Sequence, residues 1–259
     1  MEIHEEPPLA PPPSEPPSFE SFYQPSQPPD PRSTAPVAPA WHSAIVLAYL
    51  GIFTWLSAGS VPEEGLPPGM SRVALYVPVL LFQWILFGLC WWGLRLGGVS
   101  VRGVLASRWR GLAGFGRAIA VAAVFWVATF VLIASGMELL GVHEPEKNKL
   151  LATLLLPRAP LEYAVWAMVA LTAGFVEEVV FRGYLQRQFT AWFRHHGAGI
   201  ALSAAVFAAG HLYQGIAAAS VIAVIGLSFG VLAYLTRSLV PGVYAHAWAD
   251  LYPAIMGRI

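Results

Sequence analysis

Six ionisable side chains lie inside long apolar stretches of the sequence: Glu177, Glu178, Arg182, His211, His246 and Asp250. An ionised group at the centre of a bilayer costs at least about 2.5 kcal/mol, so such groups turn inward and pair with one another. Most other acidic residues lie in the first 40 residues or in the connections between apolar stretches. The six residues therefore predict one shared polar site to which several helices contribute.

Spacing separates the supporting residues from those that are free to do chemistry. Glu178 precedes Arg182 by four residues, which is the better order for an ion pair on a helix. Glu177 is rotated by about 100° from Glu178, so its position does not commit it to Arg182 and leaves it to handle a proton. Two more pairs share a helical face at four-residue spacing: Phe207 with His211, and His246 with Asp250. Each histidine is thus presented inward from a different helix.

A glutamate and two histidines around a water molecule form a reasonable hydrolytic unit. Glu177 can act as a general base, and a histidine with a hydrogen-bonding partner can donate to the oxyanion of the tetrahedral intermediate. The same three residues, Glu177, His211 and His246, are also a known zinc ligand set with the fourth position open for water. The residues alone leave both mechanisms open, with one divalent metal such as zinc, or none, as the cofactor.

The elements that must position these residues are membrane helices. The chain has 259 residues, of which 56% are apolar and 12% charged, about half the charged fraction of a soluble domain. The zero net charge argues against a nucleic-acid partner. Seven apolar windows are candidate spanning helices: 41–60, 73–94, 118–137, 161–186, 198–213, 216–236 and 239–256. We expect an all-α fold, a polytopic transmembrane helix bundle of about seven helices, the fifth short enough to be half-embedded.

Three parts follow one another along the chain. Residues 1–40 hold more than half of the 22 prolines and predict a disordered, Pro-rich cytoplasmic tail. Residues 41–137 form the N-terminal transmembrane helices, and residues 161–256 form the core that carries the ionisable residues. Arginines without acidic neighbours between residues 95 and 117 put this connection, and the N-terminus, in the cytoplasm. The excess of arginine over lysine suggests a bacterial chain, hence the inner (plasma) membrane.

The ionisable residues form three motifs: Glu177-Glu178-Val-Val-Phe-Arg182, Phe207-Ala-Ala-Gly-His211 and His246-Ala-Trp-Ala-Asp250. These resemble the EExxxR, FxxxH and HxxxN/D motifs of the CPBP intramembrane protease family. That family includes the type II CAAX prenyl proteases and bacterial bacteriocin-processing and self-immunity relatives. The resemblance extends from about Leu161 to Asp250.

The resemblance implies a role for each motif. Glu177 and His211 activate the water, while Glu178, Arg182 and Phe207 support the site. His246, with Asp250, binds the oxyanion. The family often has Asn where this chain has Asp250, and because a carboxylate donates only when protonated, we expect Asp250 to orient His246.

The expected function is that of an intramembrane endopeptidase, glutamate- or metal-dependent, acting on membrane-embedded or membrane-anchored peptides within the lipid bilayer. A bacterial source argues against prenylated substrates. Two alternatives remain: a catalytically inactive membrane scaffold or bacteriocin-immunity factor, and a proton-coupled transporter. The chain shows no inverted repeat of the kind common in transporters, and the complete motifs favour an active enzyme.

Counting residues along the helices puts Glu177 and His211 one or two helical turns apart in depth. We still expect them to meet within one water's span, with His246 lining the same cavity, because unpaired Glu and His side chains in hydrocarbon are too costly.

Overall fold

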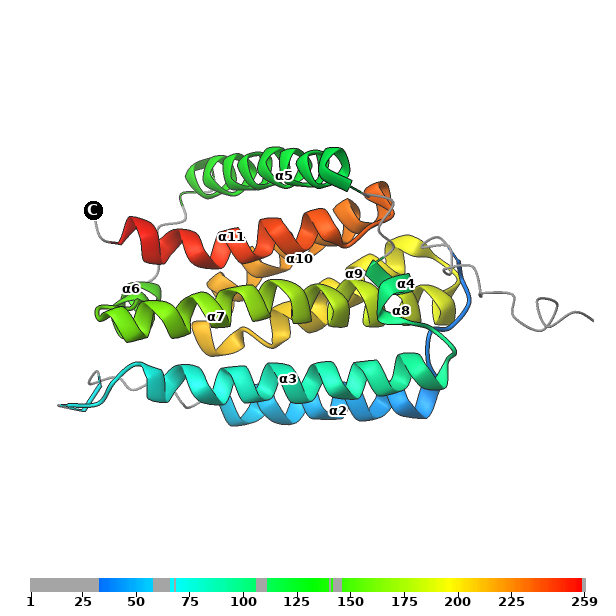
Figure 1. The fold of residues 1–259 in the computed structure, drawn as a ribbon, viewed down its shortest axis with the longest axis horizontal. Coiled ribbons are helices and arrows are strands. Elements are labelled where there is room, and N and C mark those ends of the chain that lie inside the picture. The colour runs from blue at the N-terminus through cyan, green and yellow to red at the C-terminus, as the bar shows by residue number, and fades with distance from the viewer. Residues whose placement is uncertain are drawn as a thin grey trace, which may run out of the picture.

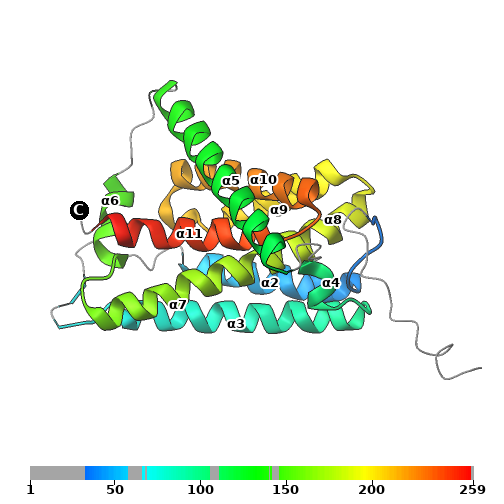
Figure 2. The same cartoon turned by 45° about the horizontal axis from the view of Figure 1, so that its top comes forward.

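The computed structural model describes residues 33–57, 66–67, 69–105, 111–139, 141 and 146–257. All regular structure in these ranges is helical, which confirms the all-α prediction. Figure 1 shows α2 (Ala40–Ser57) and α3 (Val73–Leu96) on one side of a central group that contains α7 (Pro160–Glu177). On the other side lie α11 (Val240–Met256) and α5 (Gly111–Leu139), and the view of Figure 2 shows α5 crossing the bundle at a steep angle.

Five helical segments in the described ranges are long and apolar enough to cross a membrane: Ala40–Ser57, Val73–Leu96, Gly111–Leu139, Pro160–Phe193 and Ile216–Thr236. The remaining two predicted windows correspond to shorter helices. Helix α9 (His196–Ala209) has 14 residues and is too short to cross alone, and α11 has 17, the lower limit for a spanning helix. The protein is therefore an integral membrane helix bundle. Its orientation, inferred from the arginines, stays a prediction.

The central helix is longer than the predicted window 161–186. Helix α7 continues without a break into η1 (Glu178–Leu185) and α8 (Gln186–Phe193), and ends at Arg194 in the left-handed conformation. Hydropathy ended the window too early because the polar side chains of α8 are buried in protein instead of facing lipid. Gln188, for example, is fully buried.

Segment η1 is a π-helix of eight residues, all of them buried. A π-helix bonds i to i+5, which makes its turn wider than that of an α-helix, and such segments are rare and frequent at functional sites. Both Glu178 and Arg182 lie in it, directly after Glu177. The four-residue spacing of Glu178 and Arg182 predicts a regular α-helix here, and the structure differs in forming a π-helix.

Close contacts between small residues hold the helices of the core together. A Cβ added to Gly226 of α10 (Ile216–Thr236) would lie 3.1 Å from Cβ of Ala204 on α9. A Cβ added to Gly174 of α7 would lie 2.7 Å from the backbone nitrogen of Ala247 on α11. Such close approach allows dense packing where lipid gives no hydrophobic drive for association. The second contact fixes α11, and with it His246, against α7.

The last residues of the predicted tail are packed, which corrects the boundary at residue 40. Val37 and Ala38 are buried, and their backbone nitrogens donate to Oε1 of Gln188 at 3.0 and 3.2 Å. Nε2 of Gln188 donates in turn to the carbonyl oxygen of Ala38 at 2.9 Å. The sequence could not predict this contact, because hydrogen bonds from a backbone to a distant glutamine produce no hydrophobic pattern in the Pro-rich segment. Residues 1–32, the rest of that tail, lie outside the described ranges.

Candidate active site

Glu178 and Arg182 form the ion pair that their spacing predicts. Nη1 of Arg182 lies 2.9 Å from Oε1 of Glu178, and each side chain is only 1% exposed. Nη2 of Arg182 donates to the carbonyl oxygen of Gly226 at 3.0 Å. The guanidinium carbon lies 4.9 and 5.1 Å from the ring centres of Phe207 and Phe229. Arg182 is thus bonded on several sides and acts as a counter-charge within the protein.

His246 lies among three carboxylates. Its Nδ1 is 3.1 Å from Oε1 of Glu178, the oxygen that Arg182 also uses. Because a carboxylate accepts, Nδ1 carries a proton and the ring is held by Glu178. On its other side, Nε2 lies 3.6 Å from Oε2 of Glu177 and 3.8 Å from Oδ2 of Asp250. The residue that orients the ring most directly is therefore Glu178, while Asp250 lies on the side of Nε2.

His211 has one nitrogen bonded and one left for chemistry. Its Nδ1 lies 2.9 Å from the carbonyl oxygen of Phe207. A carbonyl only accepts, so Nδ1 carries the proton and Nε2 of the neutral ring is left with a lone pair. This is the tautomer that a general base requires.

Helix α9 runs antiparallel to the central helix and packs against it. Oγ of Ser203 donates to the carbonyl oxygen of Phe181 at 2.6 Å, and the rings of Phe207 and Phe181 are 4.9 Å apart. The central helix extends to residue 193, seven residues beyond the end of the predicted window, so the depth count started from the wrong end point. His211, four residues after Phe207, lines the same cavity as Glu177, and their meeting within one water's span stays a prediction.

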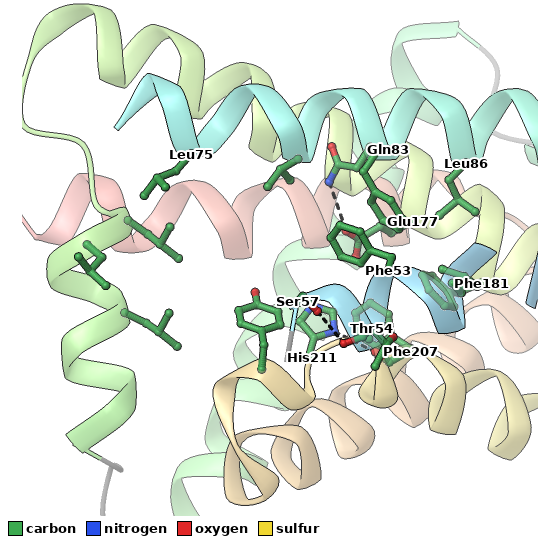
Figure 3. Close-up of a pocket in the computed structure, with 18 residues that line it drawn as sticks. Phe53, Thr54, Ser57, Leu75, Gln83, Leu86, Glu177, Phe181, Phe207 and His211 are labelled. Carbon is green, nitrogen blue, oxygen red and sulfur yellow. Dashed lines mark hydrogen bonds between the residues drawn. The ribbon is translucent and has the colours of Figure 1, made fainter. Parts of the chain in front are cut away.

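Glu177 and His211 line one cavity of about 260 Å³ (Figure 3). Most of the lining is apolar and comes from α2, α3, α6 (Glu146–Leu155) and the turn after His211. The expectation that His246 lines the same cavity is wrong, since His246 is not among the lining residues. It contacts Glu177 instead, so Glu177 is the residue that connects the cavity to the buried His246–Glu178–Arg182 group.

The proposed zinc ligands do not form a ligand set. Within the part of the chain that the structure describes, no three His, Cys, Asp or Glu side chains are grouped so that they could hold one metal ion. Nδ1 of His211 is bonded to the carbonyl oxygen of Phe207 and Nδ1 of His246 to Glu178, which leaves Nε2 of each ring as the nitrogen that would bind a metal. Only the placement of the three side chains therefore speaks against a shared metal, and the choice between the two mechanisms stays a prediction.

Sequence reasoning missed a further polar residue in the site. Gln83 of α3 is 2% exposed, and its Nε2 donates to Oε1 of Glu177 at 3.3 Å (Figure 3). The available signal was a single glutamine inside the uncharged window 73–94. The defining residues of the three motifs are mainly ionisable, and none of them lies in the first half of the chain.

The C-terminal part of the chain, which carries the three motifs, resembles a known protein family. Residues 159–252 match the model of a protein family described as Type II CAAX prenyl endopeptidase Rce1-like. No curated protein and no solved structure matches the chain. The matched segment contains all three motifs and with them Glu178, Arg182 and His246. Helices α2 to α6 precede it. This segment, from α7 to α11, is therefore similar to the type II CAAX prenyl endopeptidase family.

Proposed function

We propose that this protein is an intramembrane endopeptidase in which Glu177 and His211 activate the attacking water and His246 stabilises the oxyanion, with no metal. One observation carries the proposal: the carboxylate of Glu177 lines a cavity together with His211 and also contacts His246. Glu177 and His211 are thus two proton acceptors at one cavity, and His246, the potential oxyanion donor, contacts the carboxylate of Glu177.

The reaction begins with a water held between Glu177 and Nε2 of His211. As its oxygen attacks the carbonyl carbon of the substrate peptide bond, the water gives a proton to this pair, and the carbonyl oxygen becomes an oxyanion. When the carbon–nitrogen bond breaks, the same pair returns the proton to the leaving amine. A positioned general base of this kind contributes about 10²- to 10⁴-fold to the rate.

His246 does not line the cavity, so in this proposal the scissile carbonyl lies against Glu177, and Nε2 of His246, 3.6 Å from Oε2 of Glu177, receives the oxyanion there. Since Nδ1 already donates to Glu178, donation from Nε2 requires a ring with protons on both nitrogens. Both nitrogens face a carboxylate, since Glu178 lies 3.1 Å from Nδ1 and Asp250 lies 3.8 Å from Nε2. An oxyanion donor of this kind supplies about 2.7–4 kcal/mol of transition-state stabilisation.

The substrate class that suits this site is a membrane-embedded or membrane-anchored peptide. The matching family is described as a CAAX prenyl endopeptidase, but the mostly apolar cavity of this chain calls only for an apolar group beside the peptide bond. The lipid bilayer is the partner from which such a peptide enters.

The test is cleavage of model membrane peptides by the purified protein in liposomes, followed by mass spectrometry. We expect Glu177→Gln and His211→Ala each to lose at least about 100-fold in kcat/KM, with unchanged thermal stability. Glu138→Gln, an exposed carboxylate at the end of α5, is the matched control and should keep full activity. Full activity of Glu177→Gln would overturn the proposal, and a wild-type protein that cleaves nothing would favour the inactive scaffold.

A further inference from the structure

Helix α6 closes one end of the cavity that Glu177 and His211 line. Leu151, Leu154 and Leu155 contribute to the lining from this helix, at the i, i+3 and i+4 spacing that puts them on one helical face. Leu151 and Leu154 are buried. Helix α6 precedes the family segment 159–252, so its leucines belong to the part of the chain that the family match does not describe.

Two hydrogen bonds from α3 hold the last turn of α6 in place. The hydroxyl of Tyr76 donates to the carbonyl oxygen of Leu155. Nη2 of Arg72 donates to the carbonyl oxygen of Thr153 at 3.0 Å. The final carbonyls of a helix have no partner within it, so these bonds satisfy two of them and fix the leucine face over the cavity. The wall formed by α6 is therefore built into the fold.

The size and polarity of the cavity define what it can hold. Its polar lining groups, Glu177 and His211 among them, belong to α2, α3, α7 and the turn after α9, whereas α6 contributes only leucines. An engineered cavity of about 150 Å³ lined by Leu, Ile and Phe binds one benzene molecule. A cavity of about 260 Å³ thus has room for one aromatic or long aliphatic side chain, with the peptide bond near Glu177.

We infer that α6 forms the far wall of a substrate subsite, which accepts one large apolar side chain from a residue flanking the scissile bond, and that Leu154 sets its size limit. This rests on the proposed function. A pocket selects between apolar groups by roughly 10- to 200-fold per methylene-sized difference. Leu, Met or Phe beside the bond should therefore be preferred, whereas Ala leaves part of the cavity empty and Trp fills it to its limit.

The test uses a Leu/Ala membrane peptide whose cleavage site has first been mapped, with Ala, Leu, Phe or Trp placed in turn on each side of that bond. Wild-type protein should cleave the Leu and Phe peptides at least about tenfold better than the Ala peptide. Leu154→Ala enlarges the subsite, so the ratio of kcat/KM for Trp to that for Leu should rise about tenfold. Leu156→Ala is the matched control, because Leu156 directly follows the three leucines that line the cavity but does not line it itself. Its ratio should equal that of the wild type.

Binding separates this inference from the proposed function. The affinities of the same peptides for the Glu177→Gln protein should follow the same size order, whether or not the wild type cleaves anything. An unchanged Trp-to-Leu ratio in a folded Leu154→Ala protein, or an equal shift in Leu156→Ala, would overturn the inference. A peptide with a farnesylated cysteine at the same position is a further arm. If it binds more than tenfold tighter than the Phe peptide, the subsite holds an isoprenoid and the side-chain assignment is wrong.

Discussion

Replacing Gln83 by leucine should lower catalysis without lowering stability. The Nε2 group of Gln83 donates to Glu177, and loss of a hydrogen bond to a charged group costs about 1.5–3 kcal/mol. Among the described residues, however, Oε1 of Gln83 has no hydrogen-bond partner. Removing an unpaired buried amide oxygen recovers about 1–3 kcal/mol. The two effects nearly cancel, so the free energy of unfolding should change by less than about 1.5 kcal/mol.

Catalysis should respond differently, because Gln83 holds the carboxylate that activates the water. A displacement of about 1 Å at a reacting group costs on the order of 100-fold in rate. We therefore expect Gln83→Leu to lower kcat by about 10- to 100-fold, with a smaller change in KM, since the lining of the cavity remains apolar. The assay is peptide cleavage in liposomes with kcat and KM determined separately, alongside thermal unfolding in detergent.

Gln188→Leu is the matched control, because Gln188 is also a buried glutamine but lies away from the cavity. Its side chain bonds three backbone groups of Val37 and Ala38, and each group left unpaired costs about 1–3 kcal/mol. This variant should lose about 3 kcal/mol or more of stability while each folded molecule keeps its kcat. If instead Gln83→Leu is destabilised to the same degree and retains the wild-type kcat, Gln83 is a packing residue and the reasoning fails.

Three further outcomes are expected. Arg182→Met removes the arginine partner of the buried carboxylate of Glu178, which keeps only His246, and should destabilise the protein by about 3–5 kcal/mol, measured by thermal unfolding. An unchanged melting temperature would mean that the pair contributes nothing. Deleting residues 1–32 should leave the melting temperature unchanged, whereas deleting residues 1–39 removes the backbone partners of Gln188 and should lower it; equal melting temperatures would contradict the docking of this segment. Purified active protein should contain less than stoichiometric zinc and keep its activity in strong chelators, which metal analysis and a cleavage assay check; loss of activity that added zinc restores would return the metal mechanism.

The sequence was sufficient to predict the helical bundle and the group of residues that meets at its centre. The penalty for charge in hydrocarbon is large, so Glu178, Arg182 and His246 had to converge, and they do. The four-residue spacing gave the Glu178–Arg182 pair directly. The energetic argument for bringing Glu177 and His211 to one cavity was sound even though the depth count disagreed with it.

Features governed by packing between distant segments could not be predicted. The π-helix η1 depends on the contacts of all eight of its buried residues, not on a local pattern. The docking of Val37 and Ala38 depends on Gln188, some 150 residues later in the chain. Helix α6 is too short for a membrane window, so hydropathy gave no sign of its leucine face.

The packing of the N-terminal segment at α8 also determines where the two ends of the chain emerge. The segment with Val37 lies at the α8 end of the bundle, and α11 finishes at the opposite end (Figure 1). We therefore predict that reporter domains joined at residue 33 and after residue 257 lie on opposite sides of the membrane. A fluorescent protein that matures only in the cytoplasm should therefore fluoresce when fused to one end and not when fused to the other. The fluorescent fusion identifies the cytoplasmic end of the bundle.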